Sequence, residues 1–345
     1  MSSQTLAVIA LTAFAAIMPM RSQAGLDVGV IEAAKKEGTV ILYSAASADA
    51  TSKICAAFKT KFGISCEYFS ASALQLFQRF NAEAEAKNVK ADVITASLLP
   101  AFNDAKSRGR IAPFKSTEGS AYPTQFRDKD NYYVAGRVIV EGIAINPKLI
   151  ESNMAPRTWV DLLDPKWKGK LIASDPGASG TGLAAFYFWE KKFGLEFIRK
   201  LATNKPLIMN SSALVANSVV SGERPVAAQL DSWEIAMRMK DALPIQAIFP
   251  TDGAPVVPSP VAVVANAPHP NAAQLLMDYL MSLEGQTLLM ENLGSYSARN
   301  DISAPKGLPK LSELKLADVD WNALQGDSGA AIARYTTILK EAGAQ

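Results

Sequence analysis

The sequence predicts an α/β protein of two lobes, each a mostly parallel sheet with helices on both faces. Short apolar segments alternate with amphipathic ones over residues 27–131 and again over 147–250, which is typical of such sheets. Between them, residues 137–146 read Arg-Val-Ile-Val-Glu-Gly-Ile-Ala-Ile-Asn, and this apolar, β-branched run predicts a buried strand. A second extended stretch, 247–265, leaves the second segment. Two crossings between two α/β units predict a double hinge.

The crossings also predict the domain boundaries. Residues 25–136 and 260–345 are expected to form the first lobe and residues 137–259 the second, with the two crossing strands as hinges. Glu141 is the acidic residue inside the first crossing. A carboxylate in a buried strand needs an internal partner or a wet surface, so we expect Glu141 to face a cleft between the lobes.

Length and composition indicate a globular protein. A chain of 345 residues is long enough for two domains of ordinary size. Hydrophobic residues make up 49% and charged residues 20%, as in most globular folds. The net charge is +2 and no basic run exceeds two residues, whereas nucleic-acid binding usually needs a clustered basic excess. We therefore expect no nucleic-acid partner.

The first residues have the pattern of an export signal. An apolar run from Leu6 to Met20 is followed by a polar Arg21-Ser22-Gln23 and then Ala24. The run is too short to span a membrane and fits the hydrophobic part of a secretory signal, although no basic residue precedes it. Residues 1–24 are therefore predicted to be a signal peptide, and the alternative is a buried N-terminal helix.

Export implies an oxidising compartment, where Cys55 and Cys66, the two cysteines of the chain, could form a disulfide. They lie on a predicted helix and on the strand after it, and a bridge that closes this short loop would contribute about 2–3 kcal/mol. The alternative is two buried thiols, because geometry decides the pairing. His269 is the only histidine and is distant from both cysteines, so no local metal motif is predicted.

The first segment reads as three strands, at residues 39–43, 64–69 and 91–95, each followed by a helix. Ligands of such sheets bind beyond the carboxyl ends of the strands. The candidate ligand-binding residues at these ends are Ser44, Ala45, Ser72 and Ser97. The alternative is that the serines only cap the helices that follow.

The second segment carries a glycine-rich loop, residues 175–182, before a helix predicted over 183–193. Its spacing matches neither a P-loop nor a dinucleotide-binding fingerprint. Backbone N–H groups at the start of the helix would still suit an anionic or polar ligand group, and they belong to Ser179, Gly180 and Thr181. The alternative is an ordinary capped turn.

A further strand, 225–230, ends at Asp231-Ser232-Trp233, and Asp231 and Trp233 complete the candidate ligand residues. Amphipathic patterns predict one helix over 271–290 and a last one over 330–341.

Three stretches have distinctive patterns: Arg157-Thr158-Trp159-Val160-Asp161-Leu162-Leu163-Asp164-Pro165 with Trp167-Lys168-Gly169-Lys170; Ser221-Gly222-Glu223-Arg224-Pro225-Val226-Ala227; and Ala267-Pro268-His269-Pro270-Asn271 with Ser282-Leu283-Glu284-Gly285-Gln286. Together they resemble the extracellular solute-binding proteins of ABC importers, in particular the branch of ferric-iron-binding proteins. The similarity spans nearly the whole chain after the signal segment. It implies a type II periplasmic-binding-protein fold with a ligand cleft between the lobes, and a location in the periplasm.

The chain departs from the iron-binding branch at two places. The two adjacent tyrosines of that branch correspond to Ser232 and Trp233 here, and neither side chain is a good ferric ligand. The place of an arginine that holds an anion beside the metal is taken by Glu141. We therefore expect a small organic solute, with ferric iron or another metal or anion as the alternative.

The candidate residues suggest what that solute carries. Glu141 and Asp231 near the Trp233 indole favour a cationic or amine-bearing group, whereas hydroxyls and helix N-termini favour an anionic one. A zwitterion or polar organic solute satisfies both. The alternative interpretation is that Glu141 pairs with Arg137 or Arg299 and that Asp231 caps a helix; a sugar or aromatic group stacked on Trp233 is a further possibility.

The predicted mechanism is binding: the lobes close around the solute and the closed form docks on a membrane permease. An enzyme is the alternative from another class, but the chain shows no catalytic constellation and we expect no catalytic residue, metal or cofactor. A solute sensor that reports to a receptor is a third class. We expect a monomer whose partners are a small-molecule solute and an inner-membrane ABC permease.

Overall fold

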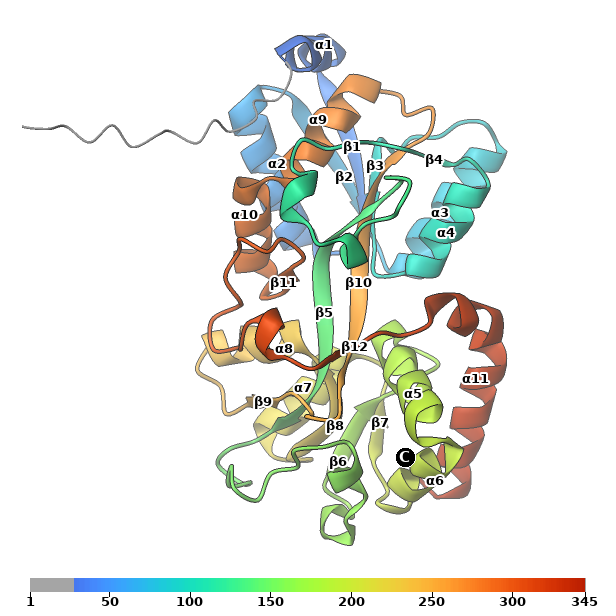
Figure 1. Ribbon diagram of the computed structural model, residues 1–345, viewed down its shortest axis with the longest axis vertical. Helices are drawn as coiled ribbons and strands as arrows, with labels where there is room; N and C mark the ends of the chain where they lie inside the picture. The colour runs from blue at the N-terminus through green and yellow to red at the C-terminus, as the bar shows by residue number, and fades with distance from the viewer. Residues whose placement is uncertain (1–27, 345) are drawn as a thin grey trace, which may run out of the picture.

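Two long antiparallel strands, β5 (Val134–Ile145) and β10 (Ala254–Val264), run side by side through the centre of the molecule and join its two lobes (Figure 1). The structure is a computed structural model that describes residues 28–344. Both strands are buried along almost their whole length, as their β-branched composition predicts. The pairing shifts by a β-bulge between Ser259 and Pro260, which accommodates a proline inside a central strand.

The first lobe packs helices on both faces of its sheet. Leu42 faces a core shared with α2 (Ala48–Phe62) and α9 (Pro270–Met281). Its neighbour Tyr43 faces a second core shared with α3 (Ala73–Glu85) and α4 (Leu99–Ser107), because side chains alternate along a strand. The elements are α1 (Val28–Glu37), β1 (Thr39–Ser44), α2 (Ala48–Phe62), β2 (Ser65–Ser70), α3 (Ala73–Glu85), β3 (Val93–Thr95), α4 (Leu99–Ser107), β4 (Ile111–Ala112), α9 (Pro270–Met281), α10 (Leu283–Leu293) and β11 (Tyr296–Ser297).

The second lobe repeats this layered plan. Leu171 and Ala173 face a core rich in aromatic side chains, and Ile172 between them faces a smaller aliphatic core. The elements are β6 (Leu171–Ser174), α5 (Gly180–Phe193), α6 (Leu195–Thr203), β7 (Leu207–Met209), α7 (Ser212–Ser221), β8 (Val226–Asp231), α8 (Ser232–Lys240), β9 (Gln246–Ile248) and α11 (Trp321–Glu341).

The strand order is β2-β1-β3-β10-β5-β8-β6-β7, so each crossing strand contributes to the sheet of both lobes. β1 pairs in parallel with β2 and β3, and β6 pairs in parallel with β7 and β8. β10 runs antiparallel to β3 in the first lobe, and β5 runs antiparallel to β8 in the second. The predicted α/β class with two crossing strands is confirmed.

The last helix belongs to the second lobe, which corrects the predicted boundary at residues 260–345. After β11 the chain passes through β12 (Leu316–Ala317), which pairs with β10, and enters α11. α11 lies beside α5 and α6 (Figure 1). The side chains by which α11 contributes to the aromatic core of that lobe are Leu324, Ala331, Tyr335, Ile338 and Leu339. The chain therefore crosses between the lobes a third time, which strand periodicity could not predict because this connection is mostly irregular.

Two predicted helices differ from the structure. The helix predicted over 271–290 is two helices, because Ser282 ends α9 and its hydroxyl accepts a hydrogen bond from the Gly285 backbone N–H at the start of α10. The helix predicted over 330–341 begins nine residues earlier, at Trp321, with Asp320 as its N-cap. Gly326 and Gly329, poor helix formers inside α11, explain the shorter prediction.

Cys55 on α2 and Cys66 on β2 are joined by a disulfide that ties this helix to the edge of the first sheet. Within residues 28–344, no helix combines the length and the hydrophobicity that crossing a membrane requires. The predicted signal peptide, residues 1–24, lies outside the described part of the chain.

Candidate functional site

One face of β5 forms the floor of the candidate site. Arg137, Ile139 and Glu141 alternate along the strand and therefore point to the same side. Their partners on neighbouring strands are Ser259 opposite Arg137, Val257 opposite Ile139 and Asp231 opposite Glu141. A cation, an apolar residue and an acid thus follow one another over a single strand, and each is matched by a residue on the adjacent strand.

Arg137 is a guanidinium held by hydroxyls. Its Nε donates to Ser259 Oγ at 3.3 Å and its Nη2 donates to Ser97 Oγ at 3.2 Å, while Ser97 Oγ donates to Ser259 Oγ at 3.0 Å. Among the described residues no carboxylate forms an ion pair with it. Burial lowers the pKa of Arg137 to about 10, and the Asp231 charge acts in the opposite direction. The group remains cationic at neutral pH and lacks a counter-ion, which suits it to an anionic ligand group.

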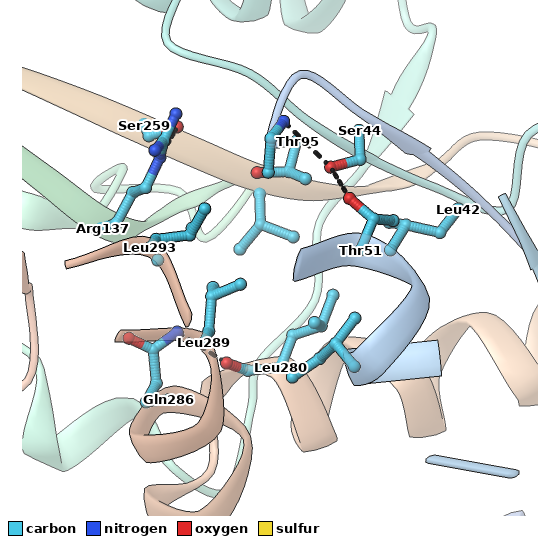
Figure 2. Close-up of a pocket in the computed structure, with 14 residues that line it drawn as sticks. Leu42, Ser44, Thr51, Thr95, Arg137, Ser259, Leu280, Gln286, Leu289 and Leu293 are labelled. Carbon is cyan, nitrogen blue, oxygen red and sulfur yellow. Dashed lines mark hydrogen bonds between the residues drawn. The ribbon is translucent and has the colours of Figure 1, made fainter. Parts of the chain in front are cut away.

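Ser44 and Arg137 line the same small cavity in the first lobe (Figure 2). The Ser44 hydroxyl is buried and accepts hydrogen bonds from the Ala46 backbone N–H and from Thr51 Oγ1, both at 3.1 Å. Next to it, the Ala45 backbone N–H donates to the Thr95 carbonyl at 2.9 Å. The cavity measures about 30 Å³, room for one or two waters and not for an organic solute. It is a small space lined by Arg137 and Ser44.

The acidic end of the floor is buried. Glu141 has no exposed surface, and neither of its carboxyl oxygens has a hydrogen-bond partner. Asp231 is 5% exposed; its Oδ2 accepts from Trp233 Nε1 at 3.0 Å, and its Oδ1 has no partner. Burial, and then the neighbouring Asp231 charge, raise the pKa of Glu141 well above its usual range.

The expectations for Glu141 need correction. We expected it to face a wet cleft, but Glu141 has no exposed surface in this structure. The alternative pairing with Arg137 or Arg299 is also wrong, since Arg137 donates to serines and Arg299 pairs with Glu118 and Asp301. An ion pair along one strand fails because residues four apart in a strand lie more than 12 Å apart at about 3.3 Å per residue.

The start of α8 carries Asp231, Ser232 and Trp233 into the site. Asp231 occupies the N-cap position, but its side chain makes no capping hydrogen bond, so the expected helix cap is wrong. The Ser232 hydroxyl is fully buried and accepts the Val140 backbone N–H of β5 at 3.1 Å. Ser232 therefore anchors α8 to the crossing strand. The Asp231 carboxylate accepts a hydrogen bond from the Trp233 indole instead.

An apolar patch lies between the cationic and acidic ends. Ile139 and Val257 pack there with Ala184 of α5, and two half-buried indoles, Trp233 and Trp321, contact the same patch. Trp321 was missed in the sequence analysis because α11 was placed in the other lobe. The signal that could have found it is Asp320, a good N-cap immediately before an amphipathic stretch.

The start of α11 also touches the first lobe. Asn103 on α4 donates from Nδ2 to Asn322 Oδ1 at 2.9 Å, and the Tyr133 hydroxyl donates to Asn103 Oδ1 at 2.7 Å. These three side chains connect elements of both lobes at a place other than the two crossing strands.

The glycine-rich loop ends in a tightly packed helix start. α5 begins at Gly180, earlier than predicted, so Gly180 and Thr181 lie in its first turn. Ser179 is the N-cap, with its hydroxyl accepting from the Gly182 N–H at 3.1 Å and lying 3.1 Å from Thr181 Oγ1. A Cβ on Gly182 would lie 3.1 Å from the Cβ of Ser174, so glycine allows this close approach.

The predicted residues do not all gather at the floor. Ser97, Glu141, Asp231 and Trp233 lie on it or beside it, whereas Ser72 is exposed and its hydroxyl is used in a capping box with Gln75. The ligand roles of Ser44, Ala45, Ser72, Ser97, Glu141, Ser179, Gly180, Thr181, Asp231 and Trp233 stay predictions. The structure adds Arg137, Ser259 and Trp321 to them.

Known proteins share this fold. Iron-bound HitA from Pseudomonas aeruginosa superposes with a TM-score of 0.75 at 22% identity, covering 87% of this chain and 99% of that one. The periplasmic binding protein AfuA from Actinobacillus pleuropneumoniae, with exogenous fructose-6-phosphate bound, gives 0.74 at 22% identity, covering 88% and 99%. The predicted type II periplasmic-binding-protein fold is therefore confirmed.

Proteins with similar sequences also bind solutes in the periplasm. A putative 2-aminoethylphosphonate-binding periplasmic protein of Salmonella typhimurium is 26% identical over 299 residues, which are 82% of this chain and 86% of that protein. These relatives are solute-binding transport proteins rather than enzymes. A family described as bacterial extracellular solute-binding protein matches residues 88–326, well over half of the chain. This protein is therefore a member of the bacterial extracellular solute-binding proteins, the capturing components of ABC importers.

Proposed function

We propose that this protein captures a small zwitterion, with an anionic group and an amine, and delivers it to the permease of an ABC importer. The anionic group binds at Arg137, Ser97 and Ser259, and the ammonium group binds at Glu141 and Asp231. The carbon chain between them lies on the apolar patch of Ile139 and Val257. The two lobes close on this solute by movement about β5 and β10.

The observation that carries the proposal is the charge pattern on one face of β5. Arg137 is a cation without a counter-ion, and Glu141 with Asp231 is an acid pair without a cation. Structural ion pairs normally neutralise such groups within the protein. Here the cationic end lacks an anion and the acidic end lacks a cation. A zwitterionic ligand supplies both charges.

The ligands of similar proteins support this proposal. 2-Aminoethylphosphonate, named for the Salmonella relative, combines an amine and a phosphonate two carbons apart. The fructose-6-phosphate in the AfuA structure is also an anionic organic solute. We take an aminophosphonate or a similar amino-anion as the working substrate class.

Ferric iron is the second candidate, because HitA binds iron in the same fold. Two features of this chain disfavour it. The Ser232 hydroxyl is occupied by the Val140 N–H, and the Trp233 indole nitrogen has no lone pair to donate. Among residues 28–344, no group of three or more histidine, cysteine, aspartate or glutamate side chains could hold a metal ion.

The proposal also includes the location of the protein, its oligomeric state and its protein partner. The protein acts in the periplasm as a monomer after removal of residues 1–24, and it binds solute without chemical change. The permease is its protein partner; a receptor would replace the permease if the protein served as a sensor.

A thermal-shift and calorimetric screen tests the proposal. The probes are 2-aminoethylphosphonate, ethylphosphonate, putrescine, fructose-6-phosphate and ferric citrate. At equal probe concentrations we expect 2-aminoethylphosphonate to stabilise the protein most, and its effect should reach about 2.7 kcal/mol at 100 times its dissociation constant. Stabilisation by ferric citrate alone would refute the zwitterion, and turnover of any probe would refute a pure binding role.

A further inference from the structure

The acid pair of Glu141 and Asp231 has an unusual set of contacts. The two residues are directly opposite each other in the antiparallel pair of β5 and β8, and both are at least nine-tenths buried. Three of their four carboxyl oxygens have no hydrogen-bond partner, and the fourth receives only the Trp233 indole N–H. Two carboxylates so placed repel each other strongly in a medium of low dielectric constant, so they do not both ionise.

The surrounding charges do not relieve this repulsion. On β5 itself Arg137 is engaged with serines, and its charge interacts with Asp231 without forming an ion pair. On α8, Glu234 is paired with Arg238, and Lys240 donates to the backbone carbonyl of Glu291. Burial, and to a smaller extent the Asp231 charge, raise the pKa of Glu234. The other elements that pack on β5 offer no free cation: β9, β10 and α7 have no ionisable side chain, and β11 has only a tyrosine whose hydroxyl donates to a backbone carbonyl.

We propose that Glu141 and Asp231 form a proton-exchanging ammonium receptor, which holds one proton while empty and releases it when the ammonium group of a solute binds between the two carboxyl groups. This inference rests on the proposed zwitterionic solute and adds a coupling between capture and pH. The proton leaves a carboxyl oxygen for bulk water, the ammonium keeps its own three protons, and no covalent bond to carbon changes.

The exchange follows from electrostatics. In the empty site a shared proton removes one of two like charges, as in other carboxyl pairs that titrate in separate steps. A bound ammonium supplies the positive charge and three donors, which match the three unpartnered oxygens. Protons and ammonium therefore compete for one receptor, and the solute binds more weakly as the pH falls. Below the pKa of the empty pair the affinity changes about tenfold per pH unit.

The first test needs no solute. We expect the infrared spectrum of the ligand-free protein at pH 7 to contain the C=O band of a protonated carboxyl group. Glu141→Gln should remove this band, whereas Asp278→Asn, a matched change at a buried carboxyl that accepts from Ser116 in the other lobe, should keep it. An empty protein without the band overturns the inference, whatever the solute is.

The second test measures proton release on binding. Titrations with 2-aminoethylphosphonate in two buffers of different ionisation enthalpy give the number of protons exchanged. We expect the wild type and Asp278→Asn to release up to one proton more than Glu141→Gln, and titration of the phosphonate itself cancels in this difference. In the wild type, the infrared carboxyl band should also disappear on saturation, a measurement that does not depend on how the variants fold.

The outcomes separate the two proposals. Tight binding with equal proton exchange in the wild type and Glu141→Gln, together with a band that persists on saturation, overturns the proton-exchanging receptor and leaves the zwitterionic solute intact. Absence of binding by 2-aminoethylphosphonate counts against the proposed solute, and the infrared spectrum of the empty protein then decides whether the pair holds a proton.

Discussion

The two charged residues of the β5 face, Arg137 and Glu141, have opposite surroundings. Arg137 has hydrogen-bond partners but no counter-ion, and its pKa of about 10 keeps it charged over the whole physiological range. Glu141 has neither partner nor counter-ion, and its raised pKa favours the neutral form. Hydroxyls can solvate a cation without neutralising it, whereas an unsolvated carboxyl must keep its proton. In our proposal the cationic end is therefore a fixed receptor for an anionic group, and the acidic end is an adjustable receptor for an ammonium group.

The largest expected effect comes from Arg137→Gln. Loss of the charge-assisted hydrogen bonds to the anionic group should weaken binding of both 2-aminoethylphosphonate and ethylphosphonate by about 10–100-fold, or roughly 1.5–3 kcal/mol. The free energy of unfolding should not fall, because a partly buried cation without a counter-ion is itself costly. Calorimetry and urea unfolding measure the two quantities. Arg110→Gln, which changes an arginine bonded to Asn81 and Glu85, is the matched control.

The second effect is on stability and comes from Glu141→Gln. The folded protein holds a proton on Glu141 that the unfolded chain loses near the ordinary glutamate pKa of about 4.3. The unfolded state therefore binds fewer protons between that pH and the raised folded-state pKa, and stability falls as the pH rises through this interval. The variant should lose this decline and gain about 1–3 kcal/mol at pH 8. Urea unfolding between pH 5 and 8 measures it, and parallel curves for both proteins would show that the Glu141 pKa is normal.

The two ends also differ in how well they could be predicted from the sequence. The α/β class and the crossing strands follow from hydrophobic periodicity, and Asp231 and Trp233 follow from their position at a strand end. Arg137 was visible in the first crossing but could be assigned only as a partner for Glu141. Its true neighbours, Ser97 and Ser259, lie 40 and 122 residues away. Such contacts depend on strand register across the whole sheet, which local patterns do not encode.

Trp321 illustrates a different cause of failure. The helix that carries it was predicted too short and was placed in the wrong lobe, because the connection after β11 has no regular periodicity to follow. Long-range packing of α11 on α5 and α6, through side chains such as Tyr335, decides its position. Burial of Glu141 was missed for a related reason: a sequence shows that a charge lies in a strand, but only the packed structure shows what covers it.

Trp233→Phe should sharpen the comparison with a smaller effect. Phenylalanine keeps the contact with the apolar patch but removes the indole N–H that Asp231 Oδ2 accepts. One lost hydrogen bond costs about 0.5–1.5 kcal/mol, so binding of 2-aminoethylphosphonate should weaken about 2- to 10-fold. Binding of ethylphosphonate, which lacks the amine, should stay within twofold. Calorimetric titrations measure both affinities. An equal loss of affinity for the two solutes would mean that Trp233 contributes to binding of the anionic group as well as of the amine.

The smallest expected effect comes from Asn322→Ala, which tests whether a contact outside the crossing strands helps to hold the two lobes together. Asn322→Ala removes the hydrogen bond from Asn103 that links α11 to α4. This exposed bond is worth about 0.5–1 kcal/mol, which corresponds to a two- to fivefold shift toward the open form. Small-angle scattering should show a larger radius for the solute-free variant and an unchanged radius at saturation, because the solute then holds both lobes. Gln325→Ala, an exposed change one turn further along α11, is the control and should match the wild type. An equal shift in both variants would attribute the change to the helix rather than to its contact with the first lobe.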